Sequence, residues 1–303
     1  MKNKFLFLII VLVCAITVCR SQNVASAKFN KDSLLHHVKT LSSDAFEGRR
    51  TGTAGAEKAR TYIIHQFKNL GLQPFIEQFQ QKFSFEARGK SYDGVNILGL
   101  IKGSQKPEHY IVISAHYDHE GIKNNQIYNG ADDDASGIAG LIAFAEYFKI
   151  NPPQHSVILA AFDAEELGLV GSKHFVNNST IPLENIMLNI NLDMISRNDK
   201  NELYAVGTAY NETLKSVLSK FTPNEDIKLL MGHDGKDGLQ NWTYSSDHGP
   251  FHLKKIPFLY FGEEDHKDYH KPTDDFDNIH PVFFMNAVDT IISIFTIVDR
   301  LNL

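Results

Sequence analysis

One segment of the chain, residues 114–166, combines apolar, strand-like runs with a dense set of carboxylates. It contains Ser-Ala-His116-Tyr-Asp118, then Gly130-Ala-Asp-Asp133-Asp-Ala-Ser-Gly137, then Asp163-Ala-Glu165-Glu166. Carboxylates that leave water side by side cost several kcal/mol each unless another charge offsets theirs. Bound cations are the simplest offset, and His together with Asp and Glu suits zinc. We therefore predict that this segment forms most of a zinc site, for two ions.

Strand-like and helical patterns alternate along the chain. Apolar runs lie at 96–101, 110–115, 156–162, 186–192 and 256–261, and helical segments at 136–149, 166–177 and 210–220. Helical spacing also predicts helices at 31–43, 55–70 and 282–298, and an edge strand is expected at 75–86. The alternation favours a single α/β domain over 28–303, with a mainly parallel central sheet and helices on both faces.

The first 21 residues have the pattern of a signal peptide. Two lysines precede an apolar run over 5–18, which is too short to span a membrane comfortably. We expect cleavage between about 19 and 27, a secreted or periplasmic protein, and no membrane span in the mature chain. A lipid anchor at Cys19 is an alternative.

The rest of the chain limits the available ligands and partners. Both cysteines, Cys14 and Cys19, lie in the segment to be removed, so any zinc must be held by His and carboxylate. Loss of three basic residues and no acid changes the net charge from −6 to −9. An acidic chain without a basic run is a poor candidate for binding nucleic acid.

Several candidate ligands follow strand-like runs directly. His116 and Asp193 each end such a run, and open α/β sheets gather their ligands at the carboxyl ends of strands. Asp118 is near enough to His116 to accept a hydrogen bond from the ring nitrogen that faces away from a metal. His270 follows a further run. Rival ligands near it are His266 and His248.

The acidic runs admit a simpler explanation than metal binding. Asp132, Asp133 and Asp134 could form the negatively charged start of a helix, because acids favour a helix N-terminus. Three in a row at a strand-to-helix crossover are harder to explain without a cation, and the spacing is not that of an EF-hand. Glu165 and Glu166 point in different directions if they follow a strand, so one can bind metal while the other moves a proton.

These motifs resemble the co-catalytic zinc peptidases of family M28, which include bacterial secreted aminopeptidases. Further matching motifs are Ala164-Glu-Glu-Leu-Gly168, Asn191-Leu-Asp193-Met and Tyr269-His270-Lys-Pro272, all in the family's order. Upstream, Leu41-Ser-Ser-Asp-Ala-Phe-Glu-Gly-Arg49 also resembles the family. The similarity therefore covers nearly all of the expected mature chain.

The resemblance implies a role for each matched position. It implies two zinc ions per chain, one bound by His116 and Asp193, the other by Glu166 and His270, with Asp133 bridging both. It further implies Glu165 as general base, Asp118 as the residue that orients His116, and Tyr269 near the developing oxyanion.

The implied activity is that of a secreted exopeptidase that removes N-terminal residues from peptides by means of a metal-activated water. A glutaminyl cyclase has a similar fold but uses one zinc. A carboxypeptidase of the same clan needs a basic pocket for the substrate carboxylate, and Arg197 and Lys271 are the nearest candidates in sequence. A binding protein on a decayed peptidase scaffold would have lost ligands, whereas this chain keeps them.

Overall fold

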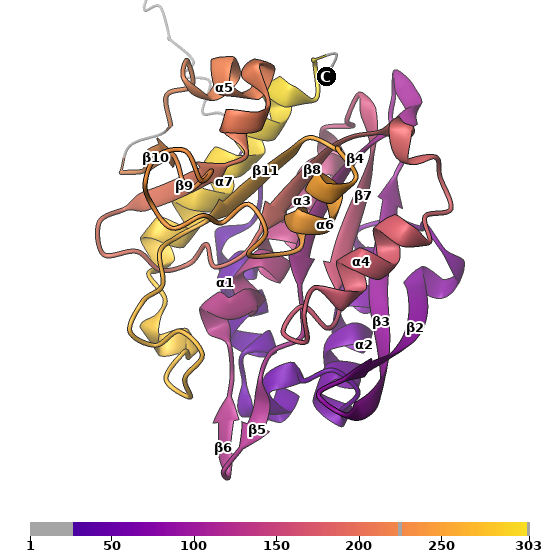
Figure 1. Cartoon of the computed structure of the whole chain (residues 1–303), viewed down its shortest axis with the longest axis vertical. Helices are drawn as coiled ribbons and strands as arrows, with labels where there is room; N and C mark the ends of the chain where they lie inside the picture. Colours follow the sequence, from indigo (N-terminus) through magenta and orange to yellow (C-terminus); the bar gives the residue numbers. More distant parts are fainter. Residues whose placement is uncertain (1–26, 224–225, 302–303) are drawn as a thin grey trace, which may run out of the picture.

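The computed structural model describes residues 27–223 and 226–301, so the predicted signal peptide lies outside the described residues. In this part of the chain nine strands form one sheet (Figure 1). They are β1 (Gln73–Pro74), β2 (Gln80–Ala87), β3 (Lys90–Ile101), β4 (Lys106–His116), β7 (His155–Phe162), β8 (Ile186–Leu192), β9 (Glu202–Val206), β10 (Lys228–Met231) and β11 (Phe258–Gly262). A separate hairpin consists of β5 (Gly121–Lys123) and β6 (Gln126–Tyr128).

The sheet has the order β1-β3-β7-β4-β8-β11-β9-β10, and β2 pairs with β3. The central strands β7, β4, β8 and β11 are parallel, as are β9 and β10. Pairs that involve β1, β2 or β3 are antiparallel, as is the pair of β11 and β9. The α/β fold with a central sheet is confirmed, and its parallel part is mostly central.

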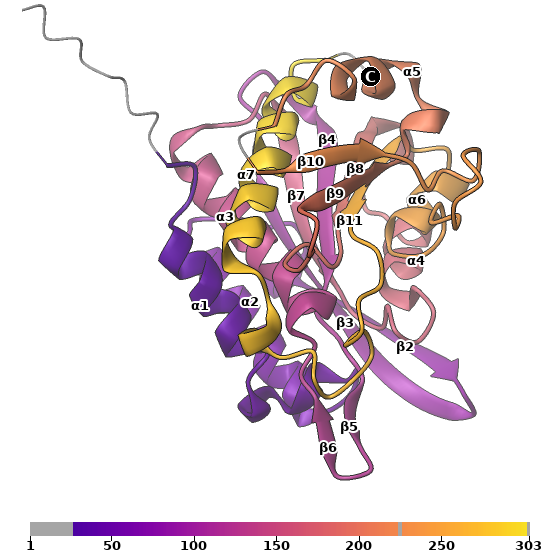
Figure 2. The ribbon, with the colours of Figure 1, turned by 90° about the vertical axis from the view of Figure 1, so that its left-hand side faces the viewer.

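Helices cover both faces of the sheet. They are α1 (Lys31–Leu41), α2 (Ala54–Asn69), α3 (Gly137–Ile150), α4 (Val170–Asn177), α5 (Glu212–Leu218), α6 (His248–Leu253) and α7 (Pro281–Val298). Figure 2 shows α1, α2, α3 and α7 on one side of the strands and α4 and α6 on the other. On β4, Ile111 and Ile113 pack in the core beneath α3, whereas Val112 packs in the core beneath α4 and α6. This alternation explains why the central strands are apolar at successive positions.

Helix α7 is, within the described residues, the one helix long and apolar enough to cross a membrane. Its side chains nevertheless belong to the core, because Phe284, Ile291 and Phe295 are almost fully buried against other elements. Phe295, for example, packs edge to face against Phe144 and Phe148, both of α3. These contacts are those of a core helix.

The fold gathers polar residues at one edge of the sheet. Strands β4, β7 and β8 are parallel and adjacent, so their carboxyl ends point the same way. His116 is the last residue of β4, and Asp193 comes directly after β8. The loop after β7 carries Glu165 and Glu166. The edge where these strands end is therefore where a ligand site is expected in an open α/β sheet.

Candidate active site

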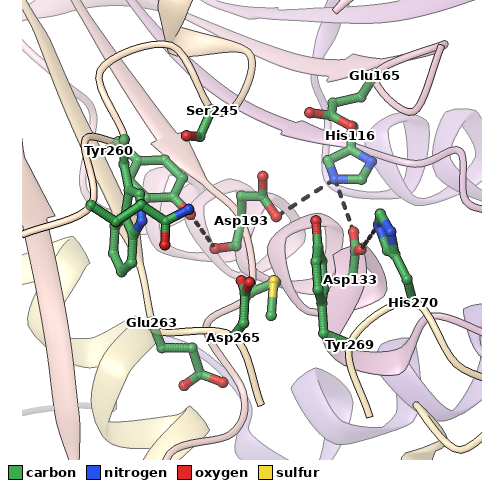
Figure 3. A pocket seen from close by; sticks show the side chains of 13 residues that line it. His116, Asp133, Glu165, Asp193, Ser245, Tyr260, Glu263, Asp265, Tyr269 and His270 are labelled. Carbon is green, nitrogen blue, oxygen red and sulfur yellow. Dashed lines mark hydrogen bonds and ion pairs between the residues drawn. The ribbon is translucent and has the colours of Figure 1, made fainter. Parts of the chain in front are cut away.

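The structure brings all five predicted metal ligands together. Figure 3 shows His116, Asp133, Asp193 and His270. His116 Nε2 lies 3.2 Å from Asp133 Oδ1 and 3.6 Å from Asp193 Oδ1. The carboxylate of Glu165 lies beside these residues, with an oxygen within 4.8 Å of atoms of His116 and Asp193. We refer to His116, Asp133 Oδ1 and Asp193 as the first donor set.

A second donor set forms on the other side of Asp133. His270 Nε2 lies 3.1 Å from Asp133 Oδ2 and 3.3 Å from Glu166 Oε1. The two oxygens of Asp133 thus face different histidines. That is the arrangement expected of a carboxylate between two cations. It depends on the turn Ala131–Ser136, which buries Asp133 between β4 and the loop after β11.

The spacing and chemistry of both sets fit zinc. Two atoms bound to a tetrahedral zinc at about 2.0–2.1 Å lie about 3.3–3.4 Å apart. The distances in both sets, 3.1 to 3.6 Å, bracket that value. Glu166 Oε1 is buried and has no hydrogen-bond partner among the described residues, although an imidazole nitrogen lies 3.3 Å away. A buried carboxylate oxygen of this kind needs a counter-charge.

The neighbouring carboxyls Glu165 and Glu166 have opposite pKa shifts. Burial raises the pKa of Glu165 well above its usual value, and Asp193 adds to that rise while His116 opposes it. Burial also disfavours charge on Glu166, but the adjacent imidazoles of His119 and His270 outweigh it and lower the pKa to about 2. Two carboxyls whose environments separate their pKa values in this way suit different tasks, one as a proton acceptor and one as a permanent anion.

Asp118 contacts the site residues differently from what the sequence indicated. His116 Nδ1 lies 3.0 Å from the backbone carbonyl of Asp118, whereas the Asp118 carboxylate is 3.8 Å away. That carboxylate instead accepts hydrogen bonds from the backbone N–H groups of Glu165, at 3.0 Å, and Glu166, at 3.3 Å. The expected contact with His116 is therefore made by the main chain, and the side chain positions the loop that carries both glutamates.

The donor sets open into a cavity of about 250 Å³. Tyr269 lines it, with its ring stacked on that of His270 at a centroid distance of 3.9 Å. In Figure 3 the Tyr269 hydroxyl points toward the space between His116 and Asp193. Burial, with the nearby Asp133 and Asp193, raises the pKa of Tyr269, so the phenol keeps its proton and can donate a hydrogen bond.

The rival histidines have other partners. His248 is buried, with Nε2 2.8 Å from the carbonyl of Trp242. His266 Nδ1 accepts the backbone N–H of Asp268 at 3.2 Å, which places the ring hydrogen on Nε2, 3.1 Å from Asp132 Oδ2. His266 therefore serves as a hydrogen-bond donor to Asp132, beside the two donor sets and outside them.

Sequence reasoning missed His119 and the role of Arg49. His119 Nδ1 lies 3.0 Å from Glu166 Oε1 and 3.6 Å from Asp133 Oδ2. The signal was present, since His119 stands directly after Asp118 in a segment already rich in ligands. Arg49 belongs to the upstream motif that resembled the family, but nothing in its sequence position indicated a contact with residues some 70 to 80 positions away.

The guanidinium of Arg49 ties the ligand-bearing loops to the N-terminal helices. It is 1% exposed and donates to the carbonyls of Tyr117, Asn129 and Gly130 at 2.8, 2.5 and 2.8 Å, and to that of Leu41 at 2.8 Å. Tyr117 follows His116 directly, Asn129 and Gly130 precede the Ala131–Ser136 turn, and Leu41 ends α1. The backbone at Glu47, Gly48 and Arg49 is left-handed, with φ of 53°, 64° and 50°, and this turn aims the guanidinium inward.

Replacement Arg49→Met should lower the free energy of unfolding by at least about 3 kcal/mol, because it leaves several buried carbonyls without a donor. Urea denaturation of the zinc-loaded protein measures this. The matched control is Arg50→Met, since Arg50 makes a partly exposed ion pair with Glu120 at 3.4 Å, which should be worth at most about 1 kcal/mol. Equal losses in the two variants would contradict the role assigned to Arg49.

Comparison with known proteins places these residues within a family. The family model described as Peptidase family M28 matches residues 96–295. Aminopeptidase YwaD of Bacillus subtilis is 30% identical over 276 residues, which cover 86% of this chain and 54% of the relative. The alkaline phosphatase isozyme conversion protein of Escherichia coli is 27% identical over 212 residues, covering 65% of this chain and 58% of that protein. The chain thus spans little more than half the length of these two relatives.

Solved structures with low sequence identity share the fold. A zinc aminopeptidase from Bacillus subtilis superposes with a TM-score of 0.72 at 18% identity, covering 90% of this chain and 97% of that one. A glutaminyl cyclase from Porphyromonas gingivalis gives a TM-score of 0.71 at 18% identity, covering 89% and 99%. The family match spans about two thirds of the sequence and includes the segments that supply both donor sets. The chain belongs to peptidase family M28.

Proposed function

We propose that the protein is an exported aminopeptidase that uses two zinc ions to hydrolyse the N-terminal peptide bond of its substrates. The observation that carries this proposal is the position of Asp133, whose two oxygens lie 3.2 Å from His116 Nε2 and 3.1 Å from His270 Nε2. Export is proposed from the charged and apolar pattern of residues 1–21.

His116 and Asp193 would hold one ion, Glu166 and His270 the other, and Asp133 both. When bound, zinc would polarise the scissile carbonyl and make a water acidic enough to attack at neutral pH. Glu165 supplies the proton acceptor. Its carboxyl lies beside His116 and Asp193 and takes up a proton readily, so it can receive the water's proton and return it to the leaving amine. The Tyr269 hydroxyl points into the same space and can donate a hydrogen bond to a substrate oxygen there.

The charge of the cavity supports cleavage at the N-terminus. Among the described residues that line it, none is Lys or Arg, whereas Asp265 adds an acidic side chain beyond those of the donor sets. A free α-ammonium group is attracted to such a wall and a C-terminal carboxylate is repelled. Arg197, one of the two basic candidates for a carboxypeptidase, lies outside this lining and pairs with Asp268 at 2.6 Å.

Mass spectrometry of one peptide with Gln at its N-terminus tests the proposal. We expect the zinc-loaded mature protein to produce a ladder that loses residues from the N-terminus, and we expect a chelator to stop it. The matched control is the same peptide with an acetylated N-terminus, which should stay intact. Loss of ammonia without a ladder would instead indicate a glutaminyl cyclase. Trimming from the C-terminus, or cleavage of the acetylated peptide, would contradict an aminopeptidase.

A further inference from the structure

His119 is buried beside the second donor set without any conventional partner. It is 1% exposed, and neither ring nitrogen has a hydrogen-bond partner among the described residues. Its ring fits against Gly130, where an added Cβ would approach the ring carbons to 2.6 Å. Leaving a buried polar group unpaired costs free energy, so the position of this imidazole calls for an explanation.

The environment of His119 Nδ1 is that of a metal ligand. The nitrogen lies 3.0 Å from Glu166 Oε1 and 3.6 Å from Asp133 Oδ2. In a hydrogen bond the N–H would point at the oxygen, yet Glu166 Oε1 likewise has no hydrogen-bond partner among the described residues. His119 Nδ1 and Glu166 Oε1 are therefore close but not hydrogen-bonded to each other. Two ligand atoms of one metal ion have this relation, because both point at the ion.

Together with His270, this nitrogen completes a four-atom cage. His119 Nδ1 and His270 Nε2 each lie near the same two oxygens, Asp133 Oδ2 and Glu166 Oε1, at distances of 3.0, 3.6, 3.1 and 3.3 Å. The two imidazoles meet edge to face with centroids 5.8 Å apart. A tetrahedral zinc with bonds of about 2.0–2.1 Å separates its ligand atoms by about 3.3–3.4 Å, so each imidazole nitrogen lies from the two oxygens at distances that suit ligands of one ion.

We propose that His119 is a fourth protein ligand of the ion held by Glu166, His270 and Asp133, so that the two metal positions are unequal. This inference rests on the proposed function only in assuming that metal binds here. The position with His119 has four protein donors, whereas the first donor set of His116, Asp133 and Asp193 has three.

The inequality assigns different tasks to the two positions. Zinc sites whose four ligands all come from protein are structural and closed, whereas catalytic sites keep one position for water or substrate. The first donor set would keep that open position, and it lies beside Glu165 and the Tyr269 hydroxyl. The four-donor position would bind its ion more tightly and keep Asp133 and Glu166 fixed.

Zinc affinity measured by competition with a chromophoric chelator tests the proposal without any substrate. We expect two affinities for the wild-type protein. In His119→Ser the tighter affinity should fall at least ~10-fold, a loss that even changes in the outer partners of metal ligands produce, while the weaker affinity stays within a factor of about three. The control is His109→Ser, which removes an exposed histidine of β4 and should leave both affinities unchanged.

A folded His119→Ser variant with wild-type affinities would overturn the assignment of His119. If the variant does not fold, the wild-type protein can be loaded with 113Cd and labelled with 15N in histidine. Coupling between cadmium and two different histidines at one ion supports the proposal, and coupling to His270 alone at that ion overturns it. A single ion per wild-type chain would contradict the two-zinc function. The difference in zinc affinity between the wild type and His119→Ser would still test whether His119 is a ligand.

Discussion

Replacement Glu165→Gln is expected to abolish nearly all peptidase activity while both zinc ions stay bound. Gln has almost the same size and shape as Glu but cannot accept a proton at neutral pH. General acid and base catalysis typically contributes about 10²- to 10⁴-fold to a rate, so kcat should fall by about that factor. Because Glu165 is outside the two donor sets, the zinc content should stay at the wild-type value. Steady-state kinetics and elemental analysis of the same preparation measure both quantities.

The matched control for this variant is Glu264→Gln. Glu264 is an exposed acid that comes directly after Glu263 of the cavity wall and does not itself line the cavity. Its replacement removes the same charge without changing the proposed base, so kcat should stay within about twofold of the wild type. A Glu165→Gln variant that retains zinc and turns over within tenfold of the wild-type rate would remove Glu165 from the role of base.

Replacement Asp133→Asn is expected to lose both ions and all activity. Each Asp133 oxygen faces a different histidine, His116 or His270, and the amide offers one oxygen without charge in place of two that share a charge. Both zinc affinities should therefore fall, by at least ~100-fold, the upper end of the losses caused by changes in the partners of metal ligands. Competition with a chelator measures this directly.

Asp193→Asn provides the comparison that separates bridging from ordinary ligation. Of His116 and His270, Asp193 pairs with His116, at 3.6 Å, and it belongs to the first donor set. Its loss should weaken one ion and leave the other at its wild-type affinity. If Asp133→Asn also weakened a single ion, Asp133 would be a ligand of one metal and the proposal of a bridged pair would fail. Circular dichroism of both variants checks that each is folded.

The site residues that could be predicted from the sequence are those close to a recognisable apolar run. His116, Glu165, Glu166 and Asp193 each stand at the end of, or shortly after, an apolar run, and a buried strand brings whatever follows it to the edge of the sheet. Asp133 stands in a run of three acids just before an apolar helix. In contrast, β9 and β10 were not predicted. They are short, and Lys228 and Met231 at the ends of β10 are exposed. The apolar run of β9 is confined to Leu203–Val206, and β10 lacks the apolar pattern that identifies the central strands.

The sequence by itself determined the α/β class, the apolar strands of the central sheet and the positions of the donor residues, because these depend on local hydrophobicity and on ligand types beside it. Only the tertiary structure decided which atoms meet. It placed the Asp118 carbonyl, rather than its carboxylate, beside His116, it brought Arg49 to carbonyls far along the chain, and it set His119 against Glu166. The Asp118 contact depends on the path of the loop after β4, and those of Arg49 and His119 depend on close packing over long sequence separations, which no local pattern encodes.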